Sequence, residues 1–215
     1  MSEATDTRRL LIEAATETFA EQGVFTSSLV EITRRAGQRN RGAVHYHFGS
    51  REGLLVAVLE QHTTFLAARE GELLARARTT PDDDLGSVLE AIIRPAVELA
   101  ETGPAGRQYL VIVGQLVEEF DRLSDAVDQA LRQTGGYDVY QLLEERMPAT
   151  DEPLRTERLT LVTSFILRSV ADRARVQQSV QQTESPGRAQ LPTERFIRNL
   201  VAMAAGMATA PAIED

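Results

Sequence analysis

Helical periodicity runs through almost the whole chain. Apolar residues recur every three or four positions, and no segment sustains the alternation of a β-strand. Glycine residues that suit helix ends punctuate this pattern. An all-α fold is therefore expected. The N-terminal helices are expected from Asp6 to Gly23, from Ser27 or Ser28 to Gly37, from Asn40 to Phe48, and from Ser50 to at least Leu66.

The remaining chain predicts a larger helical region. Proline and acidic residues suit the first turn of its first helix, and glycine pairs mark the later turns. The pattern divides the chain into an N-terminal three-helix domain at residues 1–50 and a larger helical domain at residues 51–215. The later helices are expected from Thr80 to about Ala100, from Tyr109 through Phe120 after a break at Gly103-Pro104, from Pro153 to about Val176, and from Thr193 to about Met207, with a flexible loop at residues 177–192.

Composition excludes several function classes. The 215-residue chain has no cysteine, which excludes disulfides, thiol nucleophiles and thiolate metal sites. Its three histidines all precede residue 63, and His45 and His47 stand two apart, so they point to different sides of a helix. No phosphate loop, HExxH motif or nucleophile beside a base is present. We therefore expect no enzyme, no cofactor and no metal, although a helical enzyme is the alternative from another class.

The distribution of apolar residues bears on localisation. The segment MSEATDTRR is polar, and the longest weakly apolar run, from Leu200, is short and rich in alanine. The expected protein is soluble and cytoplasmic, without a membrane partner.

Positive charge is concentrated in one segment of a chain whose formal net charge is -9. Five arginines lie from Arg34 to Arg51, and no acidic residue lies between these two positions. The segment coincides with two short helices joined by a glycine-containing turn, the pattern of a helix-turn-helix. The second helix of that motif enters the major groove of DNA, where arginines neutralise phosphates. Double-stranded DNA is therefore the expected partner, and a solvated charged surface is the alternative.

Three segments carry a family resemblance. LIEAATETFAEQG from residue 11, SLVEITRRAG from residue 28 and RGAVHYHFGSREGLL from residue 41 resemble the first four helices of TetR-family transcriptional regulators. The resemblance covers roughly residues 7–60. It implies a homodimer that binds a palindromic operator, most simply a repressor that a small organic ligand releases. An activator or global regulator of the same fold without a small-molecule inducer is the alternative.

The resemblance implies particular DNA contacts. Arg41 is favoured for reading bases, although the turn QRNR is one residue longer than the commonest family form. The family's phosphate-binding tyrosine is replaced by His45, and Tyr46 follows it, so either side chain is a candidate. Arg51 matches the family's basic residue at the start of the fourth helix. The expected DNA-contacting residues are Ser27 or Ser28, Arg39, Asn40, Arg41, Gly42, Ala43, His45, Tyr46 and Arg51.

The resemblance also implies that the last two helices pair with those of a second subunit. The helix from Pro153 agrees, because it carries two apolar stripes, one for its own core and one for a partner. A helical bundle within one chain is the alternative. The expected interface residues are Leu159, Val162, Ile166, Val170, Leu200, Met203 and Ala205.

A small, mostly apolar ligand is expected within the helices between Leu54 and Arg146. Gln115 is a single polar residue amid an apolar helix, so it needs a partner, which a neighbour, a water molecule or a ligand could supply. Arg94 lies four residues from both Glu90 and Glu98, which favours a row of ion pairs. The candidate pocket residues are His62, Phe65, Tyr109, Ile112, Gln115, Leu116, Phe120, Tyr137 and Tyr140, with His62 more simply read as a buried histidine.

Overall fold

The computed structural model describes residues 3–119, 123–182 and 189–212, which are helical without any strand, and the expected all-α fold is confirmed. Their helices are α1 (Glu3–Gln22), α2 (Leu29–Arg35), α3 (Ala43–Phe48), α4 (Arg51–Glu60), α5 (Thr63–Ala77), α6 (Leu85–Glu101), α7 (Pro104–Glu118), α8 (Asp125–Arg132), α9 (Gly136–Arg146), α10 (Glu152–Gln182) and α11 (Thr193–Ala208). None of the described helices is long and apolar enough to span a membrane.

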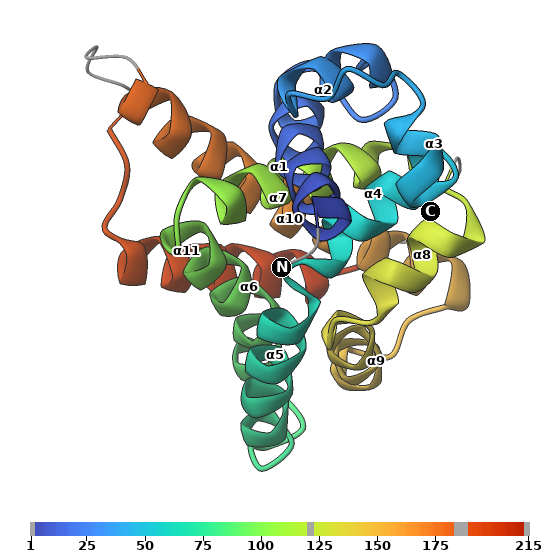
Figure 1. Ribbon diagram of the computed structural model, residues 1–215. Helices are drawn as coiled ribbons and strands as arrows, with labels where there is room; N and C mark the ends of the chain where they lie inside the picture. The colour runs from blue at the N-terminus through green and yellow to red at the C-terminus, as the bar shows by residue number, and fades with distance from the viewer. Residues whose placement is uncertain (1–2, 120–122, 183–188, 213–215) are drawn as a thin grey trace.

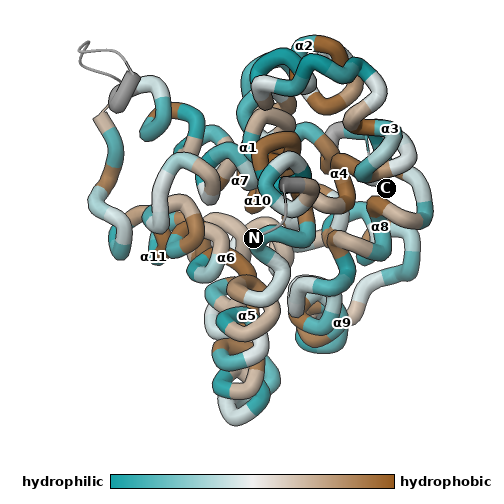
Figure 2. Tube along the Cα trace, in the orientation of Figure 1, coloured by the Kyte–Doolittle hydropathy of each residue, from teal (hydrophilic) through white to brown (hydrophobic). Residues whose placement is uncertain are grey.

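The N-terminal helices pack around a small core. Helix α1 contacts α2 and α4, and α4 also contacts α3. Leu11, Phe19, Ile32 and Leu54 are completely buried there. Figure 2 shows the hydrophobic residues of α1 and α4 on the sides where these helices meet. In Figure 1, α2 and α3 lie at the top of the molecule and α5 extends toward the opposite end.

Several expected helix boundaries in this region were wrong. Helix α1 begins at Glu3, so Asp6 lies inside it and does not cap it. Helix α3 begins at Ala43, because the Asn40 side-chain oxygen accepts a hydrogen bond from the Gly42 N–H at 2.9 Å and forms a turn first. The expected fourth helix is divided between Glu60 and Thr63 into α4 and α5. No glycine or proline marks that division, so the apolar periodicity continues across it.

The larger helical region is centred on α6 and α7. Helix α6 contacts α5, α7, α9, α10 and α11, and α7 lies between α1 and α10. Close packing of α7 on α10 requires Gly114, because a Cβ at that position would lie 2.7 Å from the Cβ of Ala171. Helix α10 extends to Gln182, so the first six residues of the expected loop are helical, and residues 183–188 lie outside the described residues.

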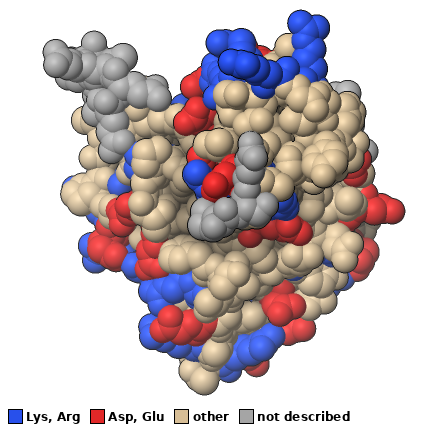
Figure 3. Space-filling view, viewed as in Figure 1, with Lys and Arg blue, Asp and Glu red and all other residues tan. Residues whose placement is uncertain are grey.

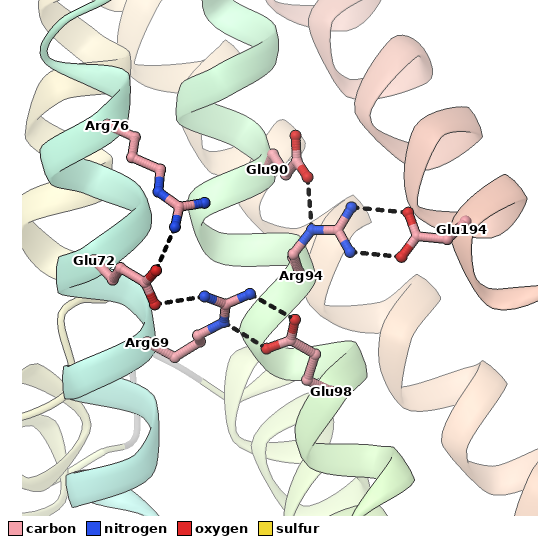
Figure 4. Close-up of polar contacts among 7 residues, drawn as sticks. All are labelled: Arg69, Glu72, Arg76, Glu90, Arg94, Glu98 and Glu194. Atoms are coloured by element: carbon pink, nitrogen blue, oxygen red, sulfur yellow. Dashed lines mark hydrogen bonds and ion pairs between the residues drawn. The ribbon is translucent and has the colours of Figure 1, made fainter.

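Ion pairs join α5, α6 and α11 (Figure 4). Arg94 of α6 pairs with Glu90 at 2.6 Å and with Glu194 of α11 at 2.6 Å. The expected Arg94–Glu98 pair was wrong, because Glu98 pairs with Arg69 of α5 at 2.7 Å. A sequence pattern within one helix does not reveal partners on neighbouring helices. The side chains are partly exposed, so each pair stabilises the fold by no more than about 1 kcal/mol.

Candidate nucleic-acid interface

Basic side chains gather over α2 and the turn that follows it (Figure 3). Arg34 donates to Glu31 at 2.7 Å, and Arg35 donates to Glu21 at 2.7 Å and to Glu31 at 3.0 Å. Hydrogen bonds from Arg34 first and Arg35 second lower the pKa of Glu31 to about 2. Two of the five clustered arginines are therefore neutralised by acids that precede the segment.

Two arginines remain available for an anionic partner. Arg39 and Arg41 are exposed, and no described residue forms a hydrogen bond or an ion pair with either. Both lie in the turn between α2 and α3, where Gly37 has a φ of 69° that few other residues adopt. Arg41 stands two residues before Ala43, the first residue of α3. Its position suits a helix whose N-terminal end enters the major groove.

The first turn of α3 has a buried side and an exposed side. Ala43 is 6% exposed and Val44 is 1% exposed, so both face the core. Ala43, an expected DNA contact, thus has very little exposed surface. Gly42 is half-buried, and a Cβ there would lie 3.2 Å from the Asn40 side-chain oxygen. Glycine therefore lets the turn close tightly.

His45 and Tyr46 are both exposed but differ in what they offer a phosphate. The His45 Nδ1 lies 3.0 Å from the carbonyl oxygen of Gly49, so Nδ1 carries a proton. In a neutral ring the Nε2 atom is then an acceptor, and only a protonated ring donates from it. Tyr46 is 81% exposed, and its hydroxyl group is a hydrogen-bond donor. His47 is half-buried and packs edge-on against Tyr46, with 4.9 Å between ring centroids.

Arg51 faces the protein interior. Its guanidinium donates to the Val24 carbonyl at 3.1 Å, to the Ser27 hydroxyl at 3.0 Å and to the Ser27 carbonyl at 2.6 Å. Ser27 is buried, whereas Ser28 is exposed at the start of α2. Arg51 and Ser27 were expected to contact DNA, but their side chains hold the α1–α2 turn together. These two side chains do not face the DNA-binding surface, because Ser27 is buried and the Arg51 side chain points toward Ser27.

Gln115 of α7 holds the other side of the same turn. Its Oε1 accepts a hydrogen bond from the Val24 N–H at 3.0 Å, and its Nε2 donates to the Phe19 carbonyl at 3.3 Å. The peptide groups of Val24 are therefore bound by α7 through the N–H and by α4 through the carbonyl. Sequence analysis identified Gln115 as a residue in need of a partner, but nothing local indicated a partner 91 residues away.

The expected pocket residues do not form one lining. Tyr109, Ile112 and Leu116 are core residues, at 3%, 0% and 0% exposed, whereas Phe65 and Tyr137 are 38% and 46% exposed. Phe120 lies outside the described residues. His62 and Tyr140 are half-buried. His62 packs edge-on against Tyr109, with ring centroids 5.1 Å apart, and burial lowers the pKa of His62.

Most expected dimer residues lie inside the protomer. Five of the seven are at most 3% exposed: Leu159, Val162, Ile166, Val170 and Leu200. Helices α6, α7 and α11 cover the apolar stripe of α10 that carries the first four, and α6 and α10 cover the side of α11 that carries Leu200. Ala205 is half-buried, and Met203 is 49% exposed. The other apolar stripe of α10 carries Leu161, which is 54% exposed, and the half-buried Phe165. The sequence shows both apolar stripes of α10, but only the helices packed against α10 determine which stripe is buried within the protomer.

Comparison with known proteins supports the arrangement of these helices. Residues 11–58 match the model of bacterial regulatory proteins of the tetR family, and residues 90–207 match the tetracyclin repressor-like C-terminal domain. The HTH-type transcriptional regulator SrpR of Pseudomonas putida is 28% identical over 165 residues, which are 76% of this chain and 72% of SrpR.

Two further comparisons extend this picture. The HTH-type transcriptional regulator TtgW of Pseudomonas putida is 32% identical over 130 residues, which are 60% of this chain and 89% of TtgW. The fold is similar to that of AibR in complex with isovaleryl coenzyme A and operator DNA, with a TM-score of 0.56, 16% identity, and 92% and 97% of the two chains covered. The chain is a helix-turn-helix transcriptional regulator that belongs to the TetR family.

Proposed function

We propose that the protein is a homodimeric repressor that binds a palindromic operator and is released by a small organic ligand. The observation that carries the proposal is a pair of exposed arginines, Arg39 and Arg41, in the turn that leads into α3 of a helix-turn-helix, where no described residue pairs with either. An arginine at the leading end of a recognition helix can read guanine through two hydrogen bonds. In this proposal the named residues bind and position DNA and do not catalyse a reaction.

The DNA-facing residues have different roles in this proposal. Arg41 reads a base, and Gly42 permits close approach of the backbone. Arg39, Asn40 and Ser28 lie at the phosphates beside it. Tyr46 is the neutral phosphate donor, and His45 adds a second donor when it is protonated. Arg51 and Ser27 act indirectly, through the position of the α1–α2 turn.

Dimerisation is proposed to use the outer surface of α10 and α11. Leu161, Phe165 and Met203 are apolar side chains left exposed or half-buried on these two helices. A two-fold axis through this surface would place two copies of α3 on successive major grooves of a palindrome, about 34–36 Å apart.

Ligand binding is proposed to reach the DNA surface through Val24. This residue connects to α4 through Arg51 and to α7 through Gln115. A ligand that shifts α7 relative to α4 must therefore displace the α1–α2 turn or break one of these hydrogen bonds. We place the DNA-binding unit at residues 1–50 and the ligand-binding and dimerisation unit at residues 51–215.

A titration of the operator complex tests the proposal. Fluorescence anisotropy of labelled operator would be followed while apolar and amphipathic compounds are added. A coupling of about 1–3 kcal/mol predicts operator affinity about 5- to 150-fold lower with ligand bound. Release by peroxide or a transition metal alone, with no response to any organic compound, would contradict the proposal.

A further inference from the structure

Helix α5 contains a buried carboxyl group that the DNA-binding function does not use. Glu70 is 5% exposed, and its Oε2 atom has no hydrogen-bond partner among the residues that the structure describes. Buried carboxylates are normally paired with a cation or fully hydrogen-bonded, because an unsatisfied buried charge is costly. The Oε2 atom of Glu70 is an exception to this rule among the described residues.

The carboxyl group lies beneath the turn that begins α9. A Cβ at Gly135 would lie 3.0 Å from the Glu70 Cβ and 3.2 Å from its Oε2. A Cβ at Gly136 would lie 3.9 Å from Oε2 and 4.0 Å from the Cδ1 of Ile92. The two glycines therefore allow the turn to approach Glu70, and α6 contributes an apolar wall beside it.

The surroundings supply partial compensation but no positive charge. Burial raises the pKa of Glu70 to about 7, against the opposing effects of the Gly135 and Gly136 N–H groups and the Thr134 hydroxyl. No arginine of the described residues contributes to that pKa. Arg69 is adjacent in the sequence, but its guanidinium binds Glu98 and Glu72 (Figure 4).

The neighbouring titratable groups do not neutralise Glu70 either. Burial, followed by the charge of Glu70, raises the pKa of Tyr109 on α7, so this side chain is a neutral phenol. His62 packs on Tyr109, and burial lowers the pKa of His62, which favours its neutral form. Arg132 of α8 lies over the Tyr137 ring, 4.7 Å from its centroid, and also binds Asp128.

We propose that Glu70 binds the ammonium group of an organic amine, whose apolar body lies between α5 and the start of α9. The proposal rests on the ligand-regulated function above and names the class of ligand. An ammonium group supplies both the positive charge and the hydrogen-bond donors that Oε2 lacks. Ile92, half-buried on α6 beside Gly136, provides apolar surface for the rest of the molecule.

Isothermal titration calorimetry with a matched pair of probes tests the proposal. Naphthylmethylamine and naphthylmethanol have the same apolar body and differ in the ammonium group. The protein is expected to bind the amine at least about tenfold more tightly than the alcohol, because one hydrogen bond would be charge-assisted. Binding at pH 7 should also release up to about half a proton, since Glu70 must ionise, and buffers of different ionisation enthalpy measure this release.

Three variants separate an amine site from a structural role of Glu70 in capping α9. Glu70→Gln retains an oxygen for the α9 N–H groups and should lose the preference for the amine and the proton release. Glu60→Gln, at an exposed position of α4, should change neither. Gly135 has an ordinary φ of −78°, so its backbone conformation accepts alanine. Gly135→Ala should weaken amine binding, because the added methyl group would lie against Oε2 of Glu70.

The outcomes distinguish this proposal from the general function. Equal binding of amine and alcohol, no amine binding at all, or unchanged amine binding by Glu70→Gln would overturn the amine site. Operator binding measured on the same samples is independent of that result. Loss of the amine site with operator binding intact would leave the proposed repressor function standing.

Discussion

Replacement of Arg51 by methionine tests whether this side chain positions the α1–α2 turn or contacts DNA. Methionine keeps most of the apolar stem and removes the guanidinium. Three hydrogen bonds to Val24 and Ser27 are lost, and the partners on the buried Ser27 are left unsatisfied. At about 1 kcal/mol net for each bond, the free energy of unfolding should fall by about 2–4 kcal/mol.

Urea unfolding and DNA binding at several salt concentrations measure the two roles separately. A positioning residue predicts the loss of stability together with weaker binding to all DNA sequences. The slope of log affinity against log salt should stay unchanged, because no phosphate contact is removed. Arg78→Met is the matched control, exposed at the end of α5, and should change stability by no more than about 0.5 kcal/mol. Unchanged stability of Arg51→Met, with the salt slope smaller by about 1.8 because the dimer loses one contact in each subunit, would refute the positioning role and indicate a phosphate contact.

Three further predictions concern the recognition helix, the dimer and the pH dependence of stability. Arg41→Ala should cost about 1–3 kcal/mol of operator binding in each half-site and relax base preference at one position there, as measured by competition among single-base operator variants; retained preference at every position would contradict base reading by Arg41. Leu161→Arg should raise the dimer dissociation constant at least about tenfold in sedimentation velocity, whereas Thr160→Arg, on the neighbouring exposed surface, should not; an unchanged dimer would exclude this stripe. Because the pKa of Glu70 is raised to about 7 in the folded state, its contribution to stability is full below pH 4.5 and is lost as the pH rises through about 7. Urea unfolding should therefore show the free energy of unfolding of the unmodified protein, relative to that of Glu70→Gln, falling by about 3 kcal/mol over this interval. Parallel pH profiles of the two proteins would contradict this prediction.

The sequence predicted helix boundaries correctly where residues at the boundary itself determine the helix end. Gly23, Gly37 and Ser50 mark helix ends in the structure as expected, because backbone conformation and capping depend on adjacent residues. The division between α4 and α5 has no such signal. Asn40 is also informative, since its side chain begins a turn where helical spacing alone predicted α3.

Sequence analysis found the basic segment but not the partners of its side chains. Arg34, Arg35 and Arg51 all belong to the cluster, yet acidic residues bind the first two and the α1–α2 turn binds the third. Neighbours on another helix decide these outcomes, and a single sequence does not reveal them. The same reason explains why the buried stripe of α10 was taken for the dimer surface. Glu70 was missed because its burial arises from the packing of α9 on α5.

Selection from a random duplex DNA library tests the central claim most directly. The unmodified protein and Arg41→Ala would each be used to enrich bound duplexes at physiological salt, and the enriched pools would be sequenced. Sequence-specific binding by a symmetric dimer predicts one palindromic motif for the unmodified protein, with half-sites about one helical turn apart. The Arg41→Ala pool should show the same motif with information lost at one position in each half. Enrichment of no motif by the unmodified protein, or of the identical motif by both proteins, would contradict the account.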